Sequence, residues 1–365
     1  MRDGDILILK GHEVASLLAG QEDQLLGVVS LAYEAHAQGS SSLPHSTFLT
    51  FPENQRNRII ALPAYLGQEF DVAGVKWISS FPGNVEEKLS RASAVVILNS
   101  PLTGRPQAII EGSIISAKRT AASAVLAAKY LLSETCGGEV SAGILGCGLI
   151  NLEVVRFVLA ARPQISALNV YDISPHRARQ FKTKCEAMSN RLEVNIVPDE
   201  HRLLGESRLI SIATTVTKPH LYDLSPCVPG SIILHISLRD LSPEAILACD
   251  NIVDDVDHVC RAQTSIHLAE QLVGNRDFIR CTLADIIRGK APARKDPEGI
   301  AVFSPFGLGV LDLAVAKHVR ELAFKHNLGM VINSFLPDSA DGRETVSAHA
   351  GAWRPHFRKE HLKNI

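Results

Sequence analysis

Apolar and polar residues alternate regularly over the middle of this chain. Between about residues 119 and 303, short apolar runs are separated by segments with helical periodicity. We interpret the apolar start of Ser141–Asn151 as the first strand, and further strands are expected in Ala167–Asp172, Leu192–Val197, Leu209–Thr215, Ser231–Leu238 and Asn251–Val253. This alternation predicts an α/β fold with a Rossmann-type doubly wound parallel sheet. A ligand of such a sheet lies beyond the carboxyl ends of its strands.

Residues 1 to about 118 mix strands and helices less regularly, which indicates an α+β region. Helices are expected in Glu13–Leu18 and Gln24–Ala37, with a loop at Gly39–Ser42 and a long Ala-rich helix at about 112–132. Strands are expected in Asp5–Leu9, Ser46–Phe51, Arg58–Leu62, Val72–Ser79, Ala94–Asn99 and Pro106–Ile110. The last two strands should form a hairpin, because Pro101–Gly104 is typical of a turn.

A glycine-rich turn follows the first strand of the middle region. Gly146 permits a tight turn, and Gly148 lets a pyrophosphate come close to the backbone. Leu149, Ile150 and Asn151 then begin a helix, whose free N–H groups and positive dipole end attract phosphate. Asn151 stands where Gly or Ala is usual, so the pattern is weak by itself.

The next strand strengthens this interpretation because it ends on an acid. Asp172 lies 172 − 146 = 26 positions after Gly146, close to the spacing of a ribose-binding carboxylate. An Asp at this place favours NAD, since it would repel the extra phosphate of NADP. The alternative is an ordinary strand-to-helix turn with a surface Asp. Ser174 and Pro175 then predict a helix start, with Ser as the cap.

The last predicted helix suggests how the chain is divided. Val310–His326 is amphipathic, and we expect it to return to the first region. Residues 1–118 with 304–336 would then form one discontinuous domain, and residues 119–303 the nucleotide-binding domain. Residues 337–365 are polar with few aliphatic side chains, so we expect a mobile tail.

Composition excludes several classes of protein. The 365 residues are 46% hydrophobic and 21% charged, and the net charge of −2 argues against nucleic acid as a partner. No apolar run approaches a membrane span, and the N-terminus has no apolar signal core. The seven cysteines lack C-x-x-C spacing and read as reduced thiols of a cytoplasmic protein. The spacing of His and Cys predicts no metal site.

Several local patterns occur in an order that resembles the ornithine cyclodeaminase/mu-crystallin family. These patterns are Gly74–Asn84, Lys118–Ser123, Gly146–Gly148 and Ser304–Asp312. One subgroup, the NAD-dependent dehydrogenases of L-2,3-diaminopropionate biosynthesis, is similar in three further stretches: Leu145–Glu153, His235–Leu241 and Phe303–Gly309. The resemblance covers roughly residues 1–335, and the ordered set is more specific than any single member.

The resemblance implies a function. Enzymes of this subgroup oxidise N-(2-amino-2-carboxyethyl)-L-glutamate with NAD, and water splits the resulting imine into 2-oxoglutarate and 2,3-diaminopropionate for siderophores or peptide antibiotics. A pyridoxal-phosphate-dependent synthase supplies the substrate, and the first domain binds substrate and forms a homodimer. Two alternatives remain open: an ornithine cyclodeaminase or related imine reductase, and a non-catalytic nicotinamide-binding protein similar to the crystallin.

The resemblance also implies which residues contact substrate. Lys76 would bind substrate and move protons, and Asp240 would be the catalytic acid. Arg119 would bind a substrate carboxylate or the cofactor, which agrees with a buried guanidinium that needs an anionic partner. The alternatives are a solvated Lys76, an internal salt bridge for Arg119, and a helix cap for Asp240. Arg239 is a candidate for a further substrate carboxylate.

Further positions complete the expected site. His45 follows Pro44 at the position where cyclising members of the family carry Arg. It would bind an anion more weakly than Arg, which indicates a different substrate. The alternative is that His45 is a half-buried histidine of a strand. Residues at the predicted strand ends would face the cofactor, and these are Thr214, Thr215 and Ser237. Ser304 and Gly309 would lie near the nicotinamide, unless they only form the entry turn of a helix.

Overall fold

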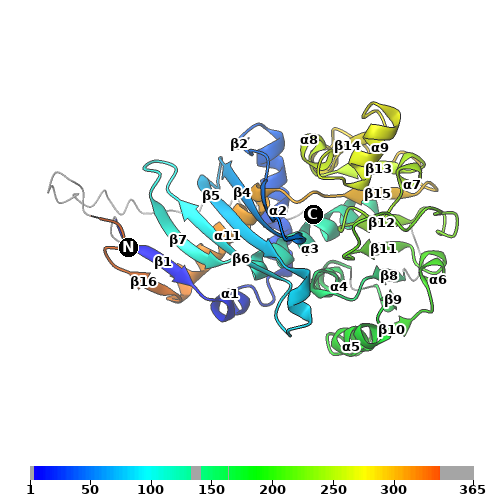
Figure 1. Ribbon diagram of the computed structural model, residues 1–365, viewed down its shortest axis with the longest axis horizontal. Helices are drawn as coiled ribbons and strands as arrows, with labels where there is room; N and C mark the ends of the chain where they lie inside the picture. The colour runs from blue at the N-terminus through cyan, green and yellow to red at the C-terminus, as the bar shows by residue number, and fades with distance from the viewer. Residues whose placement is uncertain (1–3, 133–140, 163, 338–365) are drawn as a thin grey trace.

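Two sheets organise the protein, whose computed structural model describes residues 4–132, 141–162 and 164–337 (Figure 1). Within these residues each sheet has eight strands. The tail prediction for residues 338–365 and the helix-ending segment Glu134–Gly138 lie outside the described residues.

The first sheet is mixed, in the order β16-β1-β7-β6-β5-β4-β2, with β3 paired to β4. Only β1 and β7 are parallel neighbours, and the other pairs are antiparallel. Its strands are β1 Ile6–Leu9, β2 Ser41–Ser42, β3 Thr47–Phe51, β4 Asn54–Leu66, β5 Val72–Ser80, β6 Ala92–Asn99, β7 Pro106–Glu111 and β16 Met330–Ile332. A short 3-10 helix, Pro82–Val85, follows β5.

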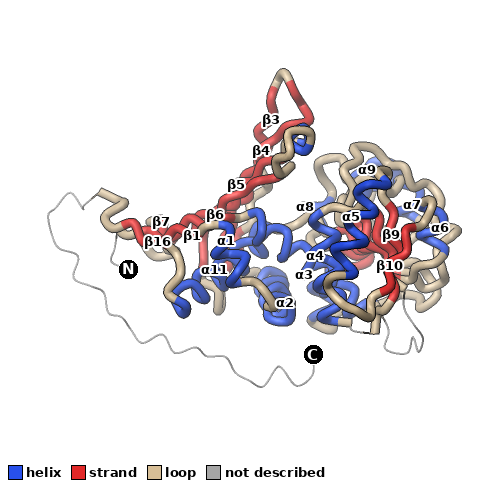
Figure 2. The backbone as a smooth tube through the Cα atoms, turned by 90° about the horizontal axis from the view of Figure 1, so that it is seen from below, coloured by secondary structure: helices blue, strands red, loops and turns tan. Residues whose placement is uncertain are grey.

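Helices cover one face of this sheet (Figure 2). They are α1 Gly11–Leu17, α2 Glu22–Ala37, α3 Ser113–Leu131 and α11 Gly309–His326. The predicted return of the last helix is seen as contact of α11 with β4, β5 and β6, and β16 then pairs with β1. These contacts support the proposal of a discontinuous first domain.

The second sheet is entirely parallel, in the order β10-β9-β8-β11-β12-β15-β13-β14, as predicted for a doubly wound fold. Its strands are β8 Ala142–Leu145, β9 Ala167–Tyr171, β10 Glu193–Ile196, β11 Leu209–Ile212, β12 Ile232–His235, β13 Asp250–Val253, β14 Ile279–Thr282 and β15 Ala301–Ser304. Its helices are α4 Leu149–Ala161, α5 Pro175–Glu186, α6 Glu200–Gly205, α7 Pro243–Leu247, α8 Val256–Val259, α9 Ser265–Val273 and α10 Leu283–Ile287. The strand order reverses between β8 and β11, which is where such sheets bind ligands.

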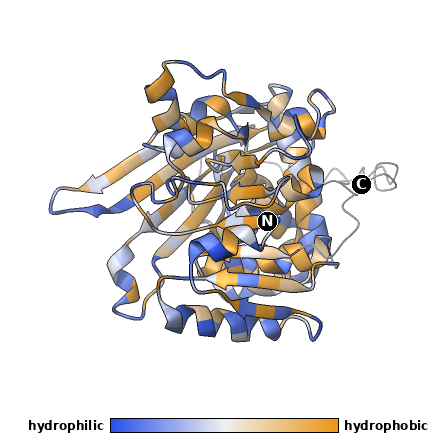
Figure 3. Cartoon of the chain, turned by 90° about the vertical axis from the view of Figure 1, so that its right-hand side faces the viewer, coloured by the Kyte–Doolittle hydropathy of each residue, from blue (hydrophilic) through white to orange (hydrophobic). Residues whose placement is uncertain are grey.

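The Ala-rich helix α3 lies between the two sheets. It contacts β6 of the first sheet and β12 and β15 of the second, as well as α2 and α4. Small side chains let these neighbours approach closely, and the shared core runs through both regions. In Figure 3 the inner strands are mainly apolar, whereas outer helices alternate between apolar and polar residues. We call the first sheet with α1, α2 and α11 the first lobe, and the second sheet with α4 to α10 the second lobe.

The predicted elements are mostly present, with three differences. β2 lies in the expected loop Gly39–Ser42, and the four-residue strands β14 and β15 were not predicted. β11 ends at Ile212 and β12 at His235, earlier than predicted. Thr214 and Ser237, just beyond those two ends, donate hydrogen bonds to Asp240. Ser174 caps α5 as expected, accepting a hydrogen bond from the Arg177 N–H.

Candidate active site

The glycine-rich turn lies between β8 and α4. Gly146 has φ +90°, and a Cβ there would lie 2.6 Å from the Ala213 carbonyl oxygen, so only glycine fits. Gly148 caps α4, is exposed, and would have nothing within 4 Å of an added Cβ. Leu149 is exposed and Ile150 half-buried at the helix start. The open N-terminus of α4 therefore has the features of a pyrophosphate site.

Asn151 has a different position from the one expected. It is fully buried, and its Nδ2 donates to the carbonyl oxygens of Leu145 at 2.9 Å and Gly146 at 2.7 Å. Its Oδ1 accepts a hydrogen bond from Ser211 Oγ at 2.7 Å. We therefore replace the predicted cofactor contact of this side chain with a supporting role: Asn151 fixes the shape of the turn.

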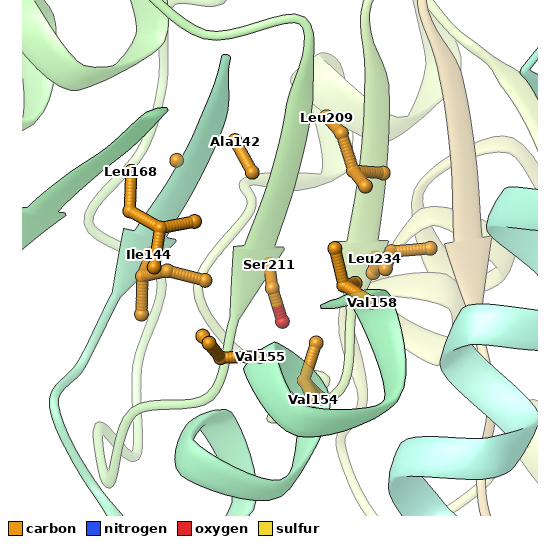
Figure 4. A pocket seen from close by; sticks show the side chains of 10 residues that line it. Ala142, Ile144, Val154, Val155, Val158, Leu168, Leu209, Ser211 and Leu234 are labelled. Atoms are coloured by element: carbon orange, nitrogen blue, oxygen red, sulfur yellow. The ribbon is translucent and has the colours of Figure 1, made fainter. Parts of the chain in front are cut away.

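A small gap lies beneath the turn, between α4 and the strands β8, β9, β11 and β12 (Figure 4). Its lining side chains are apolar except for that of Ser211, whose hydroxyl points toward α4. No lining residue is charged, so the gap offers nothing to hold an anionic ligand. It belongs to the core that supports the turn.

Asp172 follows β9 and faces the same turn. Its Oδ2 accepts a hydrogen bond from the Cys147 N–H at 2.9 Å. Its Oδ1 accepts from the Ser174 N–H at 2.8 Å and from Arg177 Nε at 3.1 Å. The carboxylate is thus fixed beside the backbone of the turn, where a ribose-binding acid is needed, and the half-exposed Arg177 side chain partly neutralises it.

Lys76 and Arg119 meet at a buried carboxylate in the first lobe. Lys76 Nζ lies 2.7 Å from Asp312 Oδ2, and Arg119 Nε donates to Asp312 Oδ1 at 2.8 Å. Lys76 also donates to Ser116 Oγ at 3.0 Å. Burial and the neighbouring Arg119 charge lower the pKa of Lys76 to about 8, against the opposing effect of Asp312. Lys76 can therefore hold or release a proton near neutral pH.

The loop before α11 passes directly over this group. Gly307 has φ +93°, and an added Cβ would lie 2.8 Å from Arg119 Nη1, so glycine is required. Buried Asp254, beyond β13 of the second lobe, accepts hydrogen bonds from the N–H groups of Phe306 at 2.9 Å and Gly307 at 2.7 Å. This places Arg119 where the two lobes meet. Gly309 packs against β4, its Cβ position being 3.2 Å from the Leu62 carbonyl oxygen.

A second buried carboxylate, Asp240, lies beyond the carboxyl end of β12. It accepts hydrogen bonds from the hydroxyls of Thr214 and Ser237 and lies 3.2 Å from His220 Nε2. Its burial favours the neutral acid, but contacts with His220 and His235 outweigh burial and hold the pKa of Asp240 well below its usual range. Asp240 is therefore an anion at neutral pH.

His220 connects this carboxylate with the surface. Its Nδ1 lies 3.1 Å from Glu200 Oε2, and its side chain is 27% exposed. Hydrogen bonds to Asp240 and Glu200 raise the pKa of His220 to about 9. The helix-cap alternative for Asp240 is wrong, because Ser242 caps α7 by accepting from the Ala245 N–H.

The other predicted residues surround these two centres. Ser304 is fully buried, with its Oγ 3.3 Å from His235 Nδ1, so we propose that it supports the Asp240 centre. Thr215 is exposed. His45 is also exposed, with its ring 5.2 Å from that of His258. Arg239 Nη2 donates to the Ala262 carbonyl oxygen at 2.7 Å.

Four residues of interest escaped sequence reasoning. Asp312 lies inside a recognised pattern, and its signal was an acid on the first turn of an amphipathic helix. His220 gave none, because it approaches Asp240 from a loop. Arg58 and Arg91 looked like ordinary surface arginines, although both are half-buried.

Two features are absent from the described part of the chain. It contains no group of three or more His, Cys, Asp or Glu residues arranged to hold a metal ion. None of its helices combines the length and the apolar character that a membrane crossing requires.

Known proteins resemble the chain along most of its length. The N-((2S)-2-amino-2-carboxyethyl)-L-glutamate dehydrogenase of Staphylococcus aureus is 28% identical over 91% of this chain and 99% of its own. The structure of the Thermococcus litoralis Delta(1)-pyrroline-2-carboxylate reductase in complex with NADH and L-proline has a TM-score of 0.82 and 26% identity, covering 89% and 99%. An archaeal alanine dehydrogenase dimer with bound NAD has a TM-score of 0.77 and 28% identity, covering 90% and 99%.

The family itself follows from a match across nearly the whole described chain. The model of the ornithine cyclodeaminase/mu-crystallin family matches residues 6–327. That span includes the second lobe, the first lobe except β16, the glycine-rich turn and the two buried carboxylate centres. The resemblance seen in the ordered sequence patterns is thereby confirmed, and the chain belongs to the ornithine cyclodeaminase/mu-crystallin family.

Proposed function

We propose that this protein is an NAD-dependent oxidoreductase that acts on a carbon–nitrogen bond of an amino-acid substrate. Its relatives include dehydrogenases and a reductase of amino acids and imines. The residues around the turn fit NAD: the open N-terminus of α4 at Gly148 suits the pyrophosphate, and Asp172 suits the ribose hydroxyls. When bound, NAD accepts a hydride from the substrate.

The finer proposal is that the substrate is N-(2-amino-2-carboxyethyl)-L-glutamate. One observation carries it together with the similarity to the staphylococcal enzyme: Lys76 and Arg119, two buried cations, share the single anion Asp312 where the lobes meet. When Lys76 is protonated, the group carries one unbalanced positive charge, which can hold one carboxylate of an anionic substrate. When Lys76 is neutral, the Arg119 guanidinium still offers hydrogen bonds to that carboxylate. The products would be 2,3-diaminopropionate and 2-oxoglutarate. A pyridoxal-phosphate-dependent synthase would supply the conjugate.

The residues divide the proton chemistry between them. The neutral form of Lys76 accepts the proton of the substrate's secondary amine, so that the α-hydrogen can leave with its electron pair. Arg119 holds the neighbouring carboxylate and thereby fixes the α-carbon. Water then adds to the carbon of the protonated imine, and the carbon–nitrogen bond breaks. We propose that the Asp240 carboxylate accepts the proton that this water loses and passes it to the leaving nitrogen, while the protonated His220 holds the carboxylate in place.

We also propose that the protein is a homodimer in which the first sheets meet. Helices cover only one face of that sheet (Figure 2). Trp77 and Tyr65 are exposed on its strands, although both are large and mainly apolar. An apolar sheet face of this kind is typically covered by a partner. A second copy is the partner we favour, because the related archaeal alanine dehydrogenase is a dimer.

Incubation with the synthetic conjugate and NAD tests the proposed function. We expect absorbance of NADH to rise, with one 2-oxoglutarate and one 2,3-diaminopropionate formed per NADH. Ornithine cyclodeamination regenerates NAD and gives no net NADH, so it is distinguished in the same assay. If L-alanine or L-proline is turned over and the conjugate is not, the proposed substrate is wrong but the oxidoreductase class is still supported.

A further inference from the structure

A pair of arginines lies on the first sheet beyond the lysine–arginine centre. Arg58 on β4 is the cross-strand partner of Ser80 on β5, and Arg91 Nη2 donates to Ser80 Oγ at 3.4 Å. Ser80 is buried, so both guanidinium groups converge on an interior position. The Nε atoms of Arg58 and Arg91 are themselves buried and have no hydrogen-bond partner. Two donors are thus desolvated without a protein acceptor, which is costly unless a ligand supplies one.

Arg239 brings a third positive charge from the second lobe. Besides burial, the charge of Arg58 lowers the pKa of both Arg91 and Arg239, so Arg58 lies within electrostatic range of each of the other two guanidinium groups. Arg239 is fixed by its hydrogen bond to the Ala262 carbonyl oxygen. Leu238, immediately before it, has φ +67°, and Ala262 has φ +52°. Such strained backbone is typical of functional sites.

No carboxylate balances this group. Over the described residues, no Asp or Glu oxygen lies within 4.0 Å of a side-chain nitrogen of Arg58, Arg91 or Arg239. The nearby Asp240 attracts Arg239 but is itself held by His220 and two hydroxyls. Three half-buried cations without an anion weaken the folded protein, and guanidinium groups match the planar geometry of carboxylates. An anionic ligand would satisfy them.

The position of this group fits the far end of a long substrate. Lys76 and Ser80 lie on the same face of β5, four residues apart, which corresponds to about 13 Å along a strand. The Lys76–Asp312–Arg119 group has charge for one carboxylate, so a substrate with two more needs cations elsewhere.

We propose that Arg58, Arg91 and Arg239 form a subsite that binds the carboxylates of the substrate lying beyond the reacting carbon. The proposal rests on the proposed oxidation of an amino-acid conjugate and deepens it, because it names the substrate class as polycarboxylates. Small monocarboxylic amino acids leave this subsite unfilled. The subsite is built from both lobes, so a polycarboxylate also draws the lobes together.

The test compares Arg58→Met and Arg91→Met with Arg56→Met, a control on the same strand whose side chain is exposed. Binding of 2-oxoglutarate, pyruvate and inorganic phosphate is measured by titration calorimetry on the full-length protein with NADH present. The parent should bind 2-oxoglutarate tighter than pyruvate. Each subsite variant should lose roughly tenfold or more of 2-oxoglutarate affinity, the scale of one charged hydrogen bond, with pyruvate affinity unchanged.

Thermal melting separates binding from structure. Removing one of three unbalanced cations should leave the melting temperature of the ligand-free protein unchanged or higher, whereas loss of a structural arginine lowers it. If a Met variant does not fold, Arg58→Lys is the alternative, because it keeps the charge but removes the planar guanidinium. This variant should still bind 2-oxoglutarate more weakly than the parent. Unchanged 2-oxoglutarate affinity in the folded variants overturns the subsite. Tighter binding of phosphate than of 2-oxoglutarate overturns its assignment to carboxylates.

The same variants keep this proposal distinct from the proposed function. Turnover of the conjugate with an unchanged KM in both Met variants would reject the subsite and leave the function intact. Dicarboxylate binding that depends on Arg58 and Arg91, in a protein that does not turn over the conjugate, would reject that substrate and support the subsite.

Discussion

The two lobes each bury one aspartate among basic side chains, but they do so differently. In the first lobe Asp312 lies between Lys76 and Arg119, and all three residues are buried. In the second lobe Asp240 lies beside His220, which reaches Glu200 and is partly exposed. We propose that the first centre binds an anionic substrate, with Arg119 as a permanent cation and Lys76 as a group that titrates near neutral pH. We propose that the second centre exchanges protons with solvent, because His220 titrates and its partner Glu200 is partly exposed.

Replacing Asp312 with Asn should have the largest effect. The change leaves Lys76 and Arg119 buried with no anion between them, which costs about 3–5 kcal/mol of unfolding free energy. It also removes the attraction that raises the pKa of Lys76, so the pH at which remaining activity appears should fall below about 8. Chemical denaturation and a pH–rate profile measure the two effects.

Asp257→Asn is the matched control, because Asp257 is exposed and pairs with Arg276. It should change neither stability nor the profile by a measurable amount. A stable and active Asp312→Asn protein would show that the first centre is not held by this carboxylate.

Replacing Asp240 with Asn tests the second centre. The size is kept, but the anion that holds His220 is lost, so turnover should fall at least ~100-fold, the scale of general acid–base help. The affinity for NAD and the melting temperature should remain close to those of the parent. The defect should shrink as pH rises, because hydroxide then replaces the missing base. If the variant keeps most of its rate at neutral pH, Asp240 is not the base that takes the proton from water, and Lys76 becomes the candidate.

His220→Gln addresses the titration of the second centre. The folded protein raises the pKa of His220 from 6.5 to about 9, so its stabilising charge is fully present below pH 6.5 and is lost as pH rises through 9. Below pH 6.5 the free energy of unfolding of the parent should exceed that of the variant by roughly 3 kcal/mol at most. Above pH 9 the two free energies should converge. Urea unfolding across this range measures the difference.

His176→Gln serves as its control, since His176 is exposed on α5. It should follow the parent at every pH. Parallel curves for the parent and His220→Gln would mean that His220 gains no proton on folding.

The smallest effect is expected at the ribose site, where the second lobe holds the nearly buried carboxylate of Asp172. The parent should prefer NAD to NADP. Asp172→Ser should lower the affinity for NAD roughly tenfold, as expected for the loss of one charged hydrogen bond. The change also frees Arg177 to attract the extra phosphate of NADP. The ratio of kcat/KM for the two cofactors reports this. If the parent used NADP as efficiently as NAD, Asp172 would not be the residue that binds the ribose hydroxyls.

The second lobe was the more predictable from sequence. Its short apolar strands, the turn at Gly146 and the acid at Asp172 are local features, and parallel strands align their carboxyl ends automatically. The same rule predicts that Thr214, Ser237 and Asp240 lie together, as their hydrogen bonds show. Strand ends were less predictable: β11 and β12 end before Thr214 and Ser237, which donate hydrogen bonds to Asp240.

The first lobe shows what local patterns do not contain. Asp312 is 193 residues from Arg119 along the chain, and only packing of α11 on the sheet brings them together. Arg58 and Arg91 similarly meet at Ser80 through strand register. Lys76 and Arg119 could be named from the family resemblance, whereas their shared partner required tertiary structure. Charge pairing between distant segments leaves no periodic signal in either segment.

The most direct test of the account compares substrates under one set of conditions. We would measure kcat/KM of the parent protein with NAD for the synthetic conjugate, L-alanine and L-ornithine. If the first lobe is built for a polycarboxylate, the conjugate should be preferred at least ~100-fold, as two additional charged contacts imply. Equal or better efficiency with L-alanine or L-ornithine would contradict the account.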